Sequence, residues 1–132
     1  MSDTPVPHHP LNDEQIRQYL RDNGSPEHIV RGGRAGLLER WRKFVEEVEH
    51  GYSFGIEDYR NDLDLRGIIE NLGLASDPTV VAADDSLRPL LQPANRRVWE
   101  SCAGEHFWDF GYPKHSSRDL QDDLKREGLW NE

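Results

Sequence analysis

The sequence predicts a mainly α-helical single domain, a bundle of about five to six helices with a small aromatic β-hairpin near the C-terminus. Three observations support this class. Apolar residues recur at helical spacing in several segments, capping residues and glycines bound those segments, and one aromatic-rich stretch alternates instead. A length of 132 residues suits one hydrophobic core. We expect residues 1–11 to form a flexible proline-rich tail and residues 12–132 to form the globular domain.

Two helices are expected before the main core helix. In residues 12–24, an Asn or Asp can cap a helix that carries apolar residues at helical spacing and stops at Gly24. The following segment, residues 25–33, begins with Ser25 as a cap and Pro26 at the first helical position. It then meets a pair of glycines, so we expect it to make only one or two turns.

The strongest helical pattern covers residues 37–50. Its apolar residues form one continuous stripe at a period of 3.6 residues, and they are Leu37, Leu38, Trp41, Phe44, Val45 and Val48. Gly51 follows as the expected end. We expect this helix to lie at the centre of the core.

An acidic cluster, "DYRNDLDLRG", lies within the next predicted helix, residues 56–72. On a helical projection Asp62 and Arg66 fall on the inner face, whereas Asp58 falls toward the outside. An Asp and an Arg four residues apart can share charge-assisted hydrogen bonds, so we expect an internal Asp62–Arg66 pair. The sequence leaves open whether this polar constellation of three residues is structural or functional.

The last third of the chain is less regular. Asp77 and Pro78 can start a helix, and Pro89 must end or kink it, so two short helices and one broken helix are both compatible. Residues 97–102 and 105–110 are expected to form the two strands of the hairpin. A final helix is expected to follow a capping pair, Ser116 and Asp119, and to end at Gly128.

Composition excludes several functional classes. A formal charge of −9 argues against a nucleic-acid binder, which needs a basic surface. A single cysteine, Cys102, cannot form an internal disulfide, and no apolar run approaches the length of a membrane span. Without a signal pattern at the N-terminus, we expect a cytoplasmic protein that does not bind a membrane.

No metal or cofactor site is expected. A calcium loop starting at Asp62 would place Arg66 and Gly73 at two obligatory ligand positions. His106 and His115 could gather round zinc only with help from other segments, since no paired-ligand spacing occurs.

No catalytic residue is predicted either. Cys102, His106 and Asp109 are close in sequence, but nothing marks a helix N-terminus that would activate the thiol. "RGGRAG" lacks the preceding strand and the Lys-Ser/Thr of a phosphate loop, so it is expected to be a joint between helices.

What remains is a hypothetical partner-binding segment near the C-terminus. Its residues are Trp99, Glu105, Phe107, Trp108, Asp109 and Tyr112. Aromatic residues are common at protein–protein hot spots, but they could equally form the lid of the core. The leading hypothesis is a non-enzymatic interaction module, of inhibitor or immunity type, that covers a basic surface of a protein partner. The alternative is a small enzyme or ligand-binding protein with a site between the Asp62/Arg66 helix and residues 99–115. The partner and the oligomeric state are not predicted.

Overall fold

The computed structural model describes residues 11–98 and 106–131, and this part of the chain is mainly helical. In chain order the elements are α1 (Asp13–Asp22), α2 (Glu27–His50), α3 (Ile56–Asn71), α4 (Pro78–Leu87), the 3₁₀ turn η1 (Arg88–Leu90), β1 (Leu91–Pro93), the 3₁₀ turn η2 (Phe107–Phe110), β2 (Gly111–Pro113) and α5 (Arg118–Arg126). The predicted class, a helical bundle with one small antiparallel sheet near the C-terminus, is confirmed.

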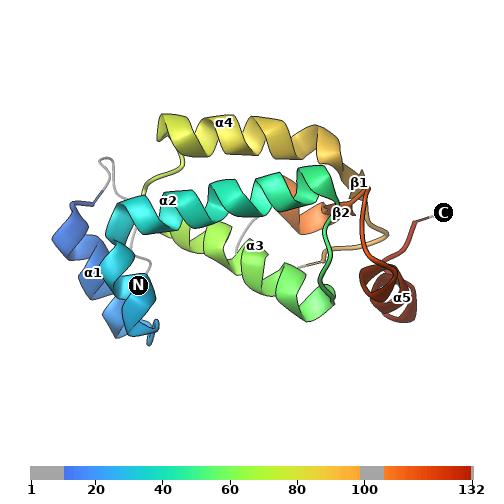
Figure 1. Ribbon diagram of the computed structural model, residues 1–132, viewed down its shortest axis with the longest axis horizontal. Helices are drawn as coiled ribbons and strands as arrows, with labels where there is room; N and C mark the ends of the chain where they lie inside the picture. Colours follow the sequence, from blue (N-terminus) through green and yellow to red (C-terminus); the bar gives the residue numbers. More distant parts are fainter. Residues whose placement is uncertain (1–10, 99–105, 132) are drawn as a thin grey trace.

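The long helix α2 is the centre of the arrangement (Figure 1). It packs against α1, α3 and α4, so it lies between α3 and α4, as expected for the residues 37–50 stripe. α1 covers one end of the molecule, and α5 packs on α3 at the other end.

A break at Gly33 divides α2 into the predicted short helix and the long core helix. Gly33 has φ of 57° and ψ of −149°, a conformation that suits glycine. The carboxylate of Asp13 in α1 accepts the N–H of Arg34 at 2.8 Å, and it thereby caps the restarted helix. A Cβ atom on Gly33 would lie 2.6 Å from Asp13 Oδ1, so this position has no room for a side chain.

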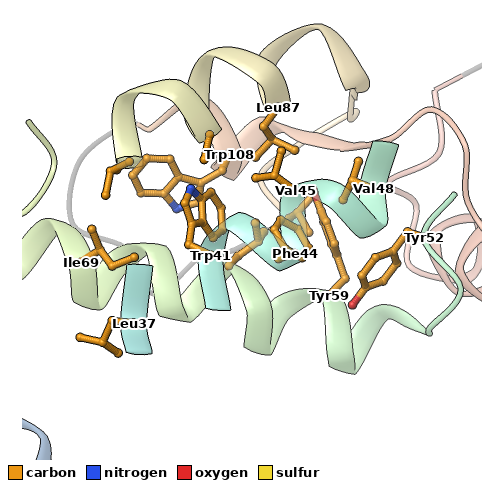
Figure 2. Packing of buried hydrophobic residues seen from close by; sticks show 14 of the residues in the cluster. Leu37, Trp41, Phe44, Val45, Val48, Tyr52, Tyr59, Ile69, Leu87 and Trp108 are labelled. Atoms are coloured by element: carbon orange, nitrogen blue, oxygen red, sulfur yellow. The ribbon is translucent and has the colours of Figure 1, made fainter. Parts of the chain in front are cut away.

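Aromatic rings fill the core along α2 and α3 (Figure 2). Trp41 and Phe44 stack with their ring centroids 5.0 Å apart, and Phe44 lies 6.0 Å from Tyr59. Tyr59 in turn meets Tyr52 edge-on at 5.5 Å. All four side chains are buried. The stripe predicted for α2 therefore faces the core, and only Leu38 among its six members is half-buried.

The β-structure differs from the predicted hairpin in its strands. β1 pairs with β2 in antiparallel fashion, with Leu91 opposite Pro113 and Pro93 opposite Gly111. The predicted strand at residues 105–110 is wrong for its described part, because Phe107–Phe110 is a 3₁₀ turn. Within that turn the carboxylate of Asp109 accepts the N–H of His106 at 3.2 Å, which favours a turn over an extended strand. Residues 99–105, which hold the predicted turn and part of both predicted strands, lie outside the described part of the chain.

The remaining helix ends follow the sequence closely. α4 stops at Leu87, two residues before Pro89, which lies in η1. α5 is capped by Ser117 rather than by the predicted Ser116, since the Ser117 hydroxyl accepts the N–H of Leu120 at 3.1 Å.

Candidate functional site

The sequence suggested that Arg66 pairs with Asp62, but in the structure Arg66 pairs with Asp84 of α4. Arg66 Nη2 donates to Asp84 Oδ2 at 2.8 Å, and Arg66 Nε donates to Oδ1 at 3.1 Å. Arg66 is 4% exposed and Asp84 is 6% exposed. The long arginine side chain reaches across to the neighbouring helix, while Asp62 takes a different partner. The predicted internal Asp62–Arg66 pair is therefore wrong.

The buried ion pair belongs to a larger network that joins several elements. Trp41 Nε1 in α2 donates to Asp84 Oδ1 at 2.9 Å, and Glu70 accepts from Arg66 Nη1 at 3.1 Å. The Arg66 guanidinium lies 4.4 Å from the centre of the Trp108 ring. Each charge thus has hydrogen-bonding partners, which is the condition under which buried charges are tolerated. This part of the predicted polar constellation ties α2, α3, α4 and η2 together.

Asp62, one turn before Arg66, lies among other acids. Its Oδ2 accepts the hydroxyl of Tyr52 at 2.7 Å. Burial raises the pKa of the Asp62 carboxyl above its usual 3.8, and the negative charges of Glu47 and Asp58 raise it further. The hydrogen bond from Tyr52 and the charge of Arg40 lower this pKa, but the net direction is upward. The ionised carboxylate is therefore held at an energetic cost in the free protein.

An exposed aromatic ring packs against the tyrosine that donates to Asp62. Phe54 is 47% exposed, and its ring meets the buried ring of Tyr52 edge-on at 5.7 Å. Tyr52 has a raised pKa because of burial, its hydrogen bond to Asp62, and the nearby charges of Asp58 and Glu47. Asp62 thus accepts the hydroxyl of Tyr52, the charges of Asp58 and Glu47 act on the same hydroxyl, and Phe54 contacts its ring. We call the surface formed by Phe54, Glu47, Asp58 and Asp62 the acidic face.

The linker that carries Phe54 is fixed to α5. Tyr52 N–H donates to the carbonyl of His115 at 2.9 Å, and the N–H of Ser117 donates back to the Tyr52 carbonyl at 2.8 Å. The Ser117 hydroxyl also donates to the carbonyl of Phe54 at 3.2 Å. Asp123 of α5 accepts the N–H of Ile56 at 3.1 Å. Phe54 is therefore presented from a linker whose backbone is hydrogen-bonded on both sides of it.

The predicted aromatic partner site is largely part of the core. Trp108, Asp109 and Tyr112 are buried, and Phe107 is half-buried. Trp99 and Glu105 lie outside the described residues. The burial of Trp108, Asp109 and Tyr112 favours the interpretation of this segment as a lid of the core. The ring that it does expose is Phe110, at 39%.

Of the trio Cys102, His106 and Asp109, for which no catalytic role was predicted, Cys102 lies outside the described residues. The other two members pack against the core. The His106 ring stacks on Trp108 at 4.4 Å with the planes 1° apart. Asp109 is 0% exposed, and its Oδ1 has no hydrogen-bond partner within the described part of the chain.

The described ranges offer neither a cluster of metal ligands nor a membrane-spanning helix. Residues 11–98 and 106–131 contain no group of three His, Cys, Asp or Glu side chains that could hold a metal ion. Over the same residues, the helices lack the length and apolar character required to cross a bilayer.

The surface of the described residues includes three open grooves. One lies beside η1, β1 and η2, a second lies between the Tyr52 linker and the start of α5, and the third lies between α2 and α4. Their volumes are about 300, 420 and 450 Å³. Neither Asp62 nor Arg66 lines any of the three.

Comparison with protein-family models, with curated proteins and with solved structures finds no match to this chain.

Proposed function

We propose that the protein is an acidic, non-enzymatic interaction module, of inhibitor or immunity type, that covers a basic surface of a protein partner in the cytoplasm. The observation that carries the proposal is the acidic face. The charges of Glu47 and Asp58 act on the Asp62 carboxyl, and Asp62 and the exposed ring of Phe54 both contact Tyr52.

The energetics of Asp62 support binding to a cationic partner. Because the pKa of this carboxyl is raised, its charged form is disfavoured in the free protein. A Lys or Arg of a partner would supply the missing opposite charge and stabilise the ionised form, so part of the binding free energy would come from relief of this repulsion. The net charge of −9 would in addition accelerate encounters with a basic surface.

Phe54 supplies the apolar element that charge alone lacks. Protein interfaces combine a buried aromatic or aliphatic centre with a polar rim. A ring held on a fixed linker loses little conformational freedom on binding, which reduces the cost of association. The acidic face thus combines one exposed aromatic ring with acidic side chains.

The alternative, a ligand or catalytic site between α3 and residues 99–115, has less support. Arg66 is the cation that α3 could contribute to such a site, but this guanidinium is buried and already donates to Asp84 and Glu70. Freeing it would require breaking a buried ion pair.

A comparative capture experiment tests the proposal. The native protein and the variant Phe54→Ser are immobilised and exposed to the same native cell extract. We expect the native protein to retain a basic protein, and the variant to retain about tenfold less of it, as for loss of an interface anchor. Val81→Ser, at a 43% exposed apolar residue of α4, is the matched control and should capture normally. Equal capture by native protein and Phe54→Ser, or capture of acidic proteins alone, would contradict the proposal.

A further inference from the structure

A groove beside η1 and the small sheet carries a positive charge, in contrast to the acidic face. Its volume is about 300 Å³, and its lining includes Arg88, Leu91, Phe107 and Phe110. This volume is at the lower end of the range for small-molecule sites, which are typically apolar with a few placed polar groups.

Arg88 is the charged group of this groove. It is exposed, and its guanidinium carbon lies 4.0 Å from the centre of the Phe107 ring. It makes no ion pair with any carboxylate of residues 11–98 or 106–131, although acids outnumber basic residues 25 to 16 in the sequence. A guanidinium that lies over a ring uses its flat face, and the N–H groups in its plane can still bind a carboxylate in bidentate fashion.

The other lining groups are apolar or already hydrogen-bonded. Phe110 is 39% exposed and Phe107 is half-buried, so both rings can contact a ligand. The amide of Gln92, which also lines the groove, donates to the Tyr112 hydroxyl and to the Asn131 carbonyl, both at 3.1 Å. A ligand would therefore find the cation of Arg88 in the lining and a mainly apolar surface, with the guanidinium carbon of Arg97 5.2 Å from the centre of the Phe110 ring.

We infer that this groove binds a small monocarboxylate with an apolar or aromatic body, which is an activity beyond the proposed protein interaction. The carboxylate pairs with Arg88, and the body packs on Phe107 and Phe110. A peptide strand is less well suited, because Pro93 of β1 and Pro113 of β2 offer no N–H groups for extension of the sheet.

The inference is tested with a pair of probes that differ in charge only. 3-Phenylpropanoate and its neutral amide, 3-phenylpropanamide, are titrated into the full-length protein at millimolar concentrations, and amide chemical shifts are followed by ¹⁵N NMR. We expect saturable shifts at Leu91, Gln92 and Phe110 with the carboxylate, and about fivefold weaker binding of the amide, as for loss of one partly exposed ion pair. Absence of saturable shifts in the groove, or equal affinity for both probes, would overturn the inference.

Substitutions at Arg88 provide the second half of the test. Arg88→Gln should abolish the preference for the carboxylate, and Arg88→Lys should retain part of it, because lysine keeps the charge without the planar fork. Lys43→Gln removes an exposed cation of α2 as the matched control, and it should preserve the native preference. If Arg88→Gln still prefers the carboxylate about fivefold, the anion binds elsewhere and the inference is wrong.

Discussion

The buried Asp84 is the residue whose substitution most sharply tests the packing of the core. Asp84→Asn removes one negative charge with little change of shape. The asparagine oxygen can still accept the Trp41 indole N–H, so that hydrogen bond is retained. What is lost is the charge opposite Arg66, which is 4% exposed and would remain as a buried cation without its ion-pair partner on α4.

The magnitude follows from the partners that Arg66 keeps. Breaking a buried ion pair by removing one partner costs about 3–5 kcal/mol. Glu70 still accepts from Arg66 Nη1 at 3.1 Å, but its side chain is 32% exposed and compensates only partly. We therefore expect a loss of about 3 kcal/mol in the free energy of unfolding, at the lower end of that range. For a chain of this size, that loss lowers the Tm by about 12 °C.

Urea denaturation of the native protein, two single variants and one double variant measures the effect. Arg66→Met should also destabilise strongly, because it strands the Asp84 charge. The double variant Asp84→Asn/Arg66→Met should regain much of the loss, since neither charge is then left unpaired. Asp64→Asn, at an exposed acid of α3, is the control and should change stability little. A change below about 0.5 kcal/mol for Asp84→Asn would refute the account of this network.

Three further outcomes are expected. Trp41→Ala should cost about 3–5 kcal/mol in urea denaturation, because a fully buried ring is removed; an unchanged unfolding midpoint would mean that the α2 stripe does not face the core. Gly33→Ala should destabilise by more than about 1 kcal/mol, because φ is 57° and the added Cβ would meet the Asp13 carboxylate. Gly36→Ala, whose added Cβ would have nothing within 4 Å, should be neutral or stabilising. Equal effects of the two substitutions would contradict the break in α2. Asp62→Asn should be at least as stable as the native protein at neutral pH. The Asp62 pKa is raised in the folded state, so its cost to stability grows as pH rises through the window above 3.8 and vanishes below it; pH-dependent unfolding that shows Asp62→Asn less stable at neutral pH would reverse the sign.

Most helices could be predicted from the sequence because their signals are local. The apolar stripe of residues 37–50 identifies the face that α2 buries. Pro26 precedes the start of α2, Gly33 breaks it, and Pro89 follows the end of α4. These features depend on neighbours within four residues, which a linear pattern records.

The partner of Arg66 could not be predicted in the same way. Spacing along one helix favours Asp62, four residues earlier, whereas the actual partner is Asp84 on another helix, 18 residues later. Only the packing of α3 against α4 decides between them. The prediction of the strands was wrong for a similar reason. Alternation at residues 97–102 predicts a local hairpin, whereas β1, which ends at Pro93, pairs with β2, which begins at Gly111.

Of the acidic face, Asp58 and Asp62 belong to the polar constellation predicted from the sequence, whose role was left open, whereas Glu47 and Phe54 were not predicted. Phe54 lies in the linker between α2 and α3, residues 51–55 (Gly-Tyr-Ser-Phe-Gly), and linkers generally run over the protein surface. The position of Phe54 in this linker therefore indicates an exposed ring. The larger number of aromatic residues near the C-terminus favoured a partner site there instead, yet Trp108 and Tyr112 are buried.

The salt dependence of partner binding tests the central claim most directly. The affinity of the captured basic partner is measured by calorimetry at about 0.05 M and about 0.5 M salt, for the native protein and for Glu47→Gln/Asp58→Asn. We expect native affinity to fall about tenfold or more between these conditions, and the variant to bind more weakly at low salt and to lose most of this dependence. A native affinity that does not change with salt, or a variant with the same salt dependence as the native protein, would contradict the assignment of the acidic face as the binding surface.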